Sequence, residues 1–351
     1  MNVDDLLKEF INTLPDIEAF YGYGSGVIKQ VGNNAGAKQL DGISVVENAK
    51  DFHIKNMKLN PNYYSLSAKV FFTLMPLATH RIGADICYIP YIKYKGATIK
   101  LGVIEDKHFS NDLRTYDNIY MAGRTQKEIK KIKEKATHND DINYNRRSAL
   151  IVSLMLLDEN EHSLYDLYYT LSSLSYLGDI RRGITINKTN YFNFEHPNKI
   201  NNIIAGSYLS YNDMYLNNKI NNNLCEISDR NNAYFKVDKN LSDEEANLEI
   251  IERLKNIKIN INNDYLFKIA DELPTYLKFF LDDYYIFNNN YTSKEDLLKL
   301  RVAITKYFEK VNRSVTIKQA LKQLLITGLS SSVKYLTAKA NKAKTKELRK
   351  I

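Results

Sequence analysis

Residues 20–47 constrain the fold most, because they join a glycine-rich turn to a strand that carries one acidic residue. The turn at 23–26 reads Tyr-Gly-Ser-Gly, and a strand is predicted over 40–46 with Asp41 on one of its faces. A turn with few side chains lets backbone N–H groups and the Ser25 hydroxyl approach a phosphate closely. A carboxylate on a facing strand can hold the metal ion that a phosphate brings. Together the two features indicate nucleotidyl transfer, and a purely structural turn is the alternative.

The glycine spacing excludes two common phosphate-binding motifs. Gly22, Gly24 and Gly26 alternate, which is not the spacing of the dinucleotide fingerprint. No Gly-Lys-Ser or Gly-Lys-Thr follows them to complete a P-loop. The prediction therefore depends on the turn and the acidic strand taken together.

Positive charge is concentrated at the C-terminal end. Of the net charge of +8, residues 334–351 supply +6, from seven Lys or Arg against Glu347. A basic end of this kind meets an anionic polymer or an anionic membrane, or it is a solvated tail. The stretch before it, over 314–340, carries an apolar stripe, and such a stripe followed by lysines is typical of an interfacial membrane anchor. A terminal helix docked on its own domain is the alternative.

Other sequence features bound the compartment. Cys87 and Cys225 lie far apart, which favours a reducing environment and argues against a disulfide framework or structural zinc. The acidic, amphipathic N-terminus does not resemble a signal peptide, and no apolar run reaches the ~18 residues of a spanning helix. We therefore expect a protein that is soluble or lies on a surface.

The predicted fold class is α+β, with a mixed sheet domain at 1–130, a mainly helical domain at 131–312 and an amphipathic basic segment at 313–351. In the helical domain, leucines between 150 and 174 form the expected core stripe. The elements predicted in the first domain are a helix over 3–14, a strand over 20–27 that leads into the turn, a strand over 40–46, a helix over 49–57, strands over 82–92 and 98–104 joined by a hairpin at Lys95-Gly96, and a helix over 109–121.

The candidate metal ligands are two strand aspartates. Transfer of a nucleotide from a nucleoside triphosphate depends on phosphate positioning and on Mg²⁺ held by carboxylates. Residue 43, two positions after Asp41, is isoleucine and not a second acid. Asp85, predicted within a neighbouring strand, is therefore the candidate second ligand. Either aspartate could instead pair with a cation at the rim of the core.

Further polar residues are candidates for the nucleotide. Arg124 and Lys127 flank Gln126, and Arg offers a fork and Lys a point charge to a triphosphate. Lys100 lies on a predicted strand, where it could face a phosphate. His53 is a lone histidine beside Lys55 and Asn56, and such a histidine is more often a structural group than a base.

The order of these motifs resembles that of the mitochondrial translocator assembly and maintenance family, the CTP:phosphatidate cytidylyltransferases of mitochondria and some bacteria. The resemblance spans most of the chain and is densest over 20–127. It rests on Tyr-Gly-Ser-Gly-Val at 23–27, Leu-Asp at 40–41, Phe-His-x-Lys-Asn at 52–56, Tyr64-Ser65, Lys100-x-Gly102-Val103, the run 120–127, the run 175–181, the run 199–204 and Leu-Ile-Thr-Gly at 325–328.

The resemblance implies a nucleotidyltransferase-fold domain, a winged-helix-like second domain and a C-terminal segment that touches an anionic membrane. The implied reaction is CTP plus phosphatidic acid giving CDP-diacylglycerol and pyrophosphate with Mg²⁺, and no nucleic-acid partner. Asp41 would hold the metal, with Ser25 and Lys127 also in catalytic roles; at Asp85 the resemblance gives no support. The implied nucleotide-binding residues are Tyr23, Gly24, Ser25, Gly26, His53, Asn56, Tyr64, Ser65, Lys100, Arg124, Gln126 and Lys127.

Two other functions stay open on the sequence. One is a nucleotidyltransferase that modifies RNA or a small molecule, with the basic end on a phosphate backbone. The other is a non-catalytic, membrane-associated assembly factor. No arginine-rich presequence is visible, so we expect peripheral attachment at the cytoplasmic face of a bacterial membrane, or at the matrix side of the mitochondrial inner membrane in a eukaryote.

Overall fold

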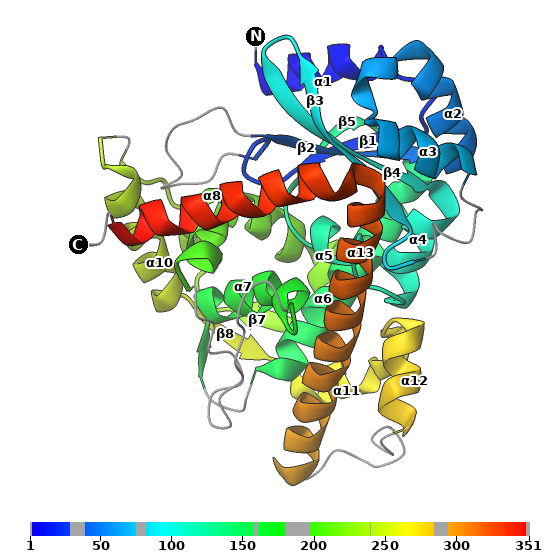
Figure 1. Cartoon of the computed structure of the whole chain (residues 1–351). Helices are drawn as coiled ribbons and strands as arrows, with labels where there is room; N and C mark the ends of the chain where they lie inside the picture. Colours follow the sequence, from blue (N-terminus) through cyan, green and yellow to red (C-terminus); the bar gives the residue numbers. More distant parts are fainter. Residues whose placement is uncertain are drawn as a thin grey trace.

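A computed structural model describes most of the chain (Figure 1). It shows an α+β protein with a five-stranded sheet, a helical region and a long C-terminal helix. The described residues are 2–28, 39–74, 82–157, 161–179, 197–238, 240–283 and 294–348.

The main sheet is mixed, with the strand order β3-β4-β2-β1-β5. Strand β1 is antiparallel to both of its neighbours, β2 and β4 are parallel, and β3 and β4 form a hairpin. The hairpin turns at Lys95 and Gly96, which have φ of 44° and 80°, so the predicted hairpin is confirmed. The strands are β1 (Ala19–Tyr23), β2 (Leu40–Val46), β3 (Ile86–Tyr94), β4 (Ala97–Glu105) and β5 (Ile129–Lys133).

Alternation along β2 gives the sheet two different faces. Leu40 and Val46 pack into a core under α1 (Val3–Ile11), α2 (Ala49–Leu59) and α3 (Leu66–Leu74). Ile43 and Val45 pack into a separate core on the other face. That second core includes residues of α4 (Asp106–Thr115), α6 (Ala136–Leu156) and α13 (Lys294–Leu348). Asp41 has the parity of Ile43, so it belongs to the second face, as predicted.

The helical region contains the largest core of the molecule. The predicted leucine stripe between 150 and 174 is buried there, which confirms its packing role. A small antiparallel sheet, ordered β6-β8-β7, lies beside the helices. The elements are α7 (Leu164–Ser173), η3 (Leu174–Tyr176), α8 (Pro197–Tyr215), α9 (Asn218–Asn221), α10 (Asp243–Asn256), α11 (Asn263–Lys268), α12 (Thr275–Asp283), β6 (His162–Ser163), β7 (Cys225–Ile227) and β8 (Lys258–Ile261).

Helix α13 connects the two parts and bends at Gly328. Before the bend it packs on α6, α12, β3 and α3. Gly328 has φ of 75° and ψ of 164°, a conformation open essentially to glycine alone. The Ile326 carbonyl accepts hydrogen bonds from the hydroxyls of Ser65 and Ser67 at 3.4 and 3.1 Å. Gly328 is thus the site of a bend that is held against α3. In the described residues, no helix combines the length and apolarity needed to cross a membrane.

Two predicted elements differ from the structure, and one strand was not predicted. The strand that was not predicted is β5, a lysine-rich segment that spans residue 130 and pairs with β1. Asp85 precedes β3 and is not within a strand. The helix predicted over 109–121 ends at Thr115, after which Tyr116 and Ile119 adopt φ of 60° and 57°. The Asp112 carboxylate explains this ending, because it accepts four backbone N–H groups from residues 118–122.

Candidate active site

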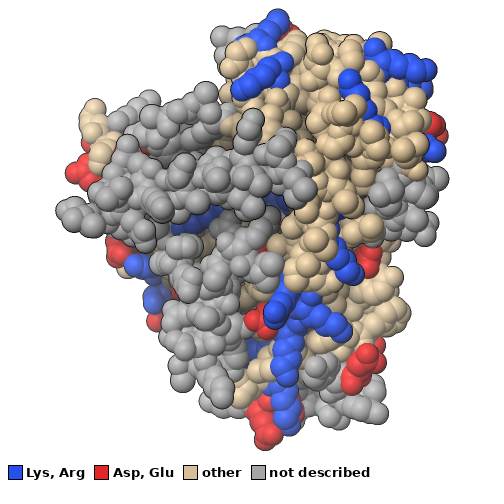
Figure 2. Space-filling view, in the orientation of Figure 1, with Lys and Arg blue, Asp and Glu red and all other residues tan. Residues whose placement is uncertain are grey.

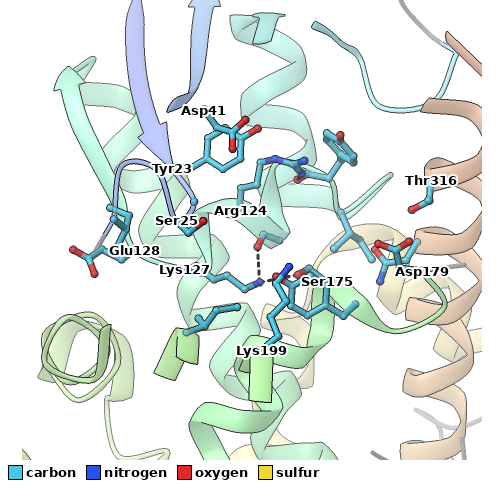
Figure 3. A pocket seen from close by; sticks show the side chains of 18 of the residues that line it. Tyr23, Ser25, Asp41, Arg124, Lys127, Glu128, Ser175, Asp179, Lys199 and Thr316 are labelled. Carbon is cyan, nitrogen blue, oxygen red and sulfur yellow. Dashed lines mark hydrogen bonds between the residues drawn. The ribbon is translucent and has the colours of Figure 1, made fainter. Parts of the chain in front are cut away.

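A cavity of about 320 Å³ lies between the main sheet and the helical region (Figure 3). Six separate helices and strands contribute residues to its walls, so folding of the whole chain is required to form it. The lining side chains that carry charge or hydrogen-bonding groups include Tyr23, Ser25, Asp41, Tyr120, Arg124, Lys127, Glu128, Ser175, Tyr176, Asp179, Lys199, Ser207, Asn312 and Thr316.

The glycine-rich turn and Asp41 meet because β1 and β2 are antiparallel neighbours. Their register sets Tyr23 opposite Asp41. The next residue, Gly24, has φ of 73°, and a Cβ built on it would lie 3.4 Å from Asp41 Oδ2. A Cβ at Gly26 would meet the Gln39 carbonyl oxygen at 2.2 Å, so the turn requires glycine there. The backbone of the turn therefore runs directly beside the Asp41 carboxylate.

Lys100 supplies the nearest positive charge to Asp41. The parallel pairing of β2 and β4 sets the two residues side by side, with Lys100 Nζ 3.8 Å from Asp41 Oδ1. The Lys100 ammonium also lies over the Tyr88 ring, 4.0 Å from its centroid. Burial raises the pKa of Asp41 above its ordinary value, and the charges of Lys100 and Arg124 oppose that rise.

Arg124 lies on α5 (Ala122–Thr125) and is held by two aromatic rings from outside that helix. Its guanidinium carbon lies 3.7 Å from the Tyr120 ring centroid and 5.3 Å from that of Tyr23. One of its amino groups donates to the Tyr120 carbonyl at 2.6 Å. Its Nε is buried and has no hydrogen-bond partner among the described residues. A guanidinium held at the cavity wall in this way suits an incoming phosphate.

Lys127 connects α5 with the helical region. Its Nζ donates to the Gly123 carbonyl at 3.1 Å and to Ser175 Oγ at 2.7 Å (Figure 3). The same ammonium lies 4.8 Å from the Tyr176 ring centroid, and the Lys199 ammonium lies 5.3 Å from it. One ring thus contacts two cations that line the same cavity.

The carboxylates of the cavity do not form a preassembled metal cage. Asp41, Glu128 and Asp179 line different sides of it (Figure 3). Over the described part of the chain, no group of three His, Cys, Asp or Glu is positioned to bind one metal ion. Asp41 lies beside the glycine-rich turn, so this donor set fits a cation that arrives with substrate phosphates and keeps part of its water shell.

Three predicted nucleotide ligands lie on the opposite face of the sheet. His53 is fully buried and stacks on Phe72, with their ring centroids 3.6 Å apart. His53 and Asn56 both hydrogen-bond the Tyr64 hydroxyl, at 3.1 and 2.9 Å. Tyr64 belongs to the core under α1, α2 and α3. These residues do not line the cavity, and their contacts are those of a packed polar cluster.

Ser65, Gln126 and Asp85 also lie outside the cavity lining. Ser65 supports the bend of α13. Gln126 is buried, and its amide donates to the Tyr116 hydroxyl at 3.0 Å and to Asn145 Oδ1 at 3.2 Å.

Asp85 lies near the far end of β4. Its neighbour Ile86 pairs with Ile104 of β4, whereas Asp41 pairs with Lys100 of the same strand. Ile104 and Lys100 are four residues apart along β4, a separation of about 13 Å. Asp85 instead faces His108, with 3.6 Å between Oδ2 and Nδ1. It cannot share a cation with Asp41 at that distance.

Sequence reasoning missed several lining residues. Ser175, Tyr176, Asp179 and Lys199 fall within the motifs that carried the family resemblance, which was the available signal for them. Their role was not evident because they are distant in sequence from the turn at 23–26. Tyr120 and Glu128, which flank the predicted Arg124 and Lys127, also line the cavity.

Comparison with known proteins supports the family resemblance. The family model described as "Phosphatidate cytidylyltransferase, mitochondrial" matches residues 7–342. The protein of that name from Caenorhabditis elegans is 34% identical over 58% of this chain and 61% of its own length. That from Schizosaccharomyces pombe is 32% identical over 57% and 49%. The human protein of that name is 33% identical over 50% and 40%.

The match to each of these curated relatives spans between 40% and 61% of the relative's length. The family model, by contrast, extends over most of this chain and includes every residue described above in the cavity. The chain therefore belongs to the mitochondrial phosphatidate cytidylyltransferase family.

Proposed function

We propose that this chain is a phosphatidate cytidylyltransferase, which converts CTP and phosphatidic acid into CDP-diacylglycerol and pyrophosphate. The observation that carries the proposal is the cavity in which the turn at 23–26, Asp41, Arg124 and Lys127 meet. Membership of a family with that name supports the choice of CTP and phosphatidic acid as substrates.

The reaction needs alignment and charge neutralisation more than covalent work by the protein. An oxygen of the phosphatidate phosphate attacks the α-phosphorus of CTP, and the bond from that phosphorus to the bridging oxygen breaks, so pyrophosphate leaves with the electron pair. The lipid phosphate is ionised at neutral pH, so no strong general base is needed. This agrees with a cavity whose lining has cations and hydroxyls.

Each group has a proposed role. The N–H groups of Gly24 and Ser25 and the Ser25 hydroxyl would bind the triphosphate through short, direct hydrogen bonds. The Arg124 guanidinium would donate to a phosphate oxygen, and Lys127 would neutralise charge that develops on the leaving pyrophosphate. Lys100 would keep Asp41 ionised.

We propose Mg²⁺ as the cofactor, with Asp41 as its protein ligand. When bound, the ion would neutralise the triphosphate and so make pyrophosphate a better leaving group. The position of Asp41 beside the turn supports this assignment, because one carboxylate together with substrate phosphates is a common way of holding Mg²⁺.

We further propose a nucleotidyltransferase fold for the sheet region and a winged-helix-like fold for the helical region. The mixed five-stranded sheet with helices on both faces supports the first, and the small sheet beside α7, α8 and α10 supports the second. A division near 130 and near 312 stays a proposal with one amendment, that β5 belongs to the sheet region.

Phosphatidic acid is a membrane lipid, so the proposed enzyme would make peripheral contact with an anionic bilayer. The basic run at 334–350 supports such a contact. The relatives are named mitochondrial, which supports the matrix side of the inner membrane in a eukaryote; in a bacterium the cytoplasmic face is the equivalent.

The test is incubation with labelled CTP, Mg²⁺ and vesicles that contain phosphatidic acid. We expect labelled CDP-diacylglycerol from the unchanged protein and none from a folded Asp41→Asn variant. Labelled RNA in place of lipid would establish the alternative nucleotidyltransferase. Absence of any CTP-derived product under these conditions would refute enzymatic function and favour an assembly factor.

A further inference from the structure

Six large apolar side chains form two exposed stripes on neighbouring helices, which we call the apolar ridge. Within each helix the residues recur every four positions, so they share one face. Their exposed fractions lie between 40% and 79%, which is unusual for a set of this size. The apolar ridge consists of Leu66, Val70 and Leu74 on α3 and Ile317, Leu321 and Leu325 on α13.

The opposite faces of the same helices hold the two stripes side by side. Ala68, Phe71 and Ile326 are buried in one core cluster. The Ser67 hydroxyl donates to the Ile326 carbonyl, which ties the start of α3 to α13 near the bend at Gly328. Figure 2 shows that the surface over α3 and the upper turns of α13 is mostly uncharged.

Both segments that build the ridge lack acidic residues. No Asp or Glu occurs between Asp51 and Asp85, a stretch that includes all of α3. None occurs between Glu309 and Glu347, and within this stretch Lys318 is an exposed cation between the ridge residues of α13. Two segments far apart in sequence therefore lack acidic side chains, and they lie beside one another.

We propose that the apolar ridge is a docking surface for an anionic lipid bilayer and that it holds the cavity at the membrane surface. The inference deepens the proposed function by naming the face through which a lipid substrate is met. Leucines inserted among the acyl chains and lysines at the headgroups complement an anionic bilayer. A second copy of this chain fits worse, because self-association would bring Lys69 and Lys318 of two copies together with no acidic residue in either ridge segment to pair with them.

Helix α13 connects the ridge to the cavity. Asn312, Val315 and Thr316 line the cavity, and Leu321 and Leu325 follow on the same helix. At 1.5 Å per residue, the ridge leucines lie about 8 to 14 Å along the axis from Thr316. The apolar ridge is therefore within about three turns of α13 from the cavity.

The chain contains no tryptophan, so a single introduced tryptophan reports on its own site. The test compares Leu74→Trp and Leu321→Trp with Leu248→Trp, which replaces a leucine that is 67% exposed on α10, away from the ridge. Each full-length variant is mixed with vesicles of phosphatidylcholine and phosphatidic acid, some carrying brominated acyl chains. We expect a blue shift and bromine quenching at both ridge positions and neither change at 248.

Three outcomes would overturn the proposal. The first is an unchanged spectrum at both ridge positions, and the second is an equal shift at 248. The third is a blue shift that grows with protein concentration in the absence of vesicles, because a second copy would then cover the ridge. As an independent readout, the double variant Leu74→Gln/Leu321→Gln should bind these vesicles with an affinity that is lower by a factor of about ten or more. The affinity of Leu248→Gln should be unchanged.

Activity measurements separate this inference from the proposed function. With a short-chain, water-soluble phosphatidate, the double variant should turn over CTP as the unchanged protein does, because the cavity is intact. With vesicles it should lose activity in parallel with binding. Failure of the proposed function would instead give no product from either lipid, while the tryptophan result would still stand.

Discussion

Gly123 on α5 lies against Ser175 of η3 across the cavity wall, and replacing this glycine tests how the site is held. A Cβ at Gly123 would lie 2.5 Å from the Ser175 Cβ, whereas carbon atoms in contact prefer about 3.5 to 4.0 Å. Gly123→Ala therefore forces α5 and η3 apart by about 1 Å. The Lys127 ammonium donates hydrogen bonds to Gly123 of α5 and to Ser175 of η3, so it must move as well.

Two effects of opposite sign determine the magnitude. Overpacking of this kind costs about 1 to 3 kcal/mol. Alanine in a helix is favoured over glycine by about 0.5 to 1 kcal/mol. Because the first effect is larger, we expect Gly123→Ala to lower the free energy of unfolding by about 1 to 2 kcal/mol. We also expect a fall in kcat/KM for CTP that approaches about a hundredfold, since a 1 Å displacement of a positioning group costs roughly that much.

A double-mutant cycle identifies the cause. Ser175→Gly removes the clashing Cβ, after which the Ser175 Cα at 3.6 Å would be in ordinary contact with the new methyl group. By urea unfolding, Gly123→Ala/Ser175→Gly should be more stable than the sum of the single variants predicts by about 1 to 2 kcal/mol. Strict additivity would refute the proposed contact between α5 and η3.

Three further predictions concern other parts of the molecule. Lys100→Met should move the acid limb of the pH–rate profile to higher pH. Burial already raises the pKa of Asp41, and the variant loses a cation that lowers this pKa, so activity is lost at a higher pH as the pH falls. An unchanged acid limb would contradict the role of Asp41. His53→Ala should lower the free energy of unfolding by about 2 to 4 kcal/mol and leave the KM for CTP within about twofold, whereas a selective rise in KM would return His53 to the site. Deletion of 334–351 should weaken binding to anionic vesicles, and the difference in affinity between the full-length and shortened proteins should shrink at high salt. Binding through the apolar ridge should persist at high salt.

The local parts of the fold could be predicted from sequence because they depend on short-range patterns. Alternation gave the strand at 40–46 and the face of Asp41, and Lys95-Gly96 gave the hairpin. Strand β5 was not predicted, because Ile-Lys-Lys-Ile-Lys is a strand only when β1 is available to pair with it. The end of α4 was also missed, because it depends on the buried Asp112 carboxylate and four backbone N–H groups.

Part of the site was predicted from the sequence, because several of its residues belong to the strands of the main sheet or to short motifs near them. Tyr23, Gly24, Ser25, Asp41, Arg124 and Lys127 line one cavity, and Lys100 contacts Asp41. His53 and Tyr64 occur in the same ordered series of motifs, but their side of the sheet is decided by the packing of α2 and α3. Lys199 and Ser175 approach Lys127 only through tertiary packing.

The central claim is that the turn at 23–26, Asp41, Arg124 and Lys127 form one nucleotide site. A crystal structure of the protein with a non-hydrolysable CTP analogue and Mg²⁺ tests it most directly. We predict triphosphate density between the Gly24-Ser25 backbone and Lys127, with the cation on Asp41. Density for the analogue in the separate cavity beside Asp85 and His108, with the predicted site containing only solvent, would contradict the account.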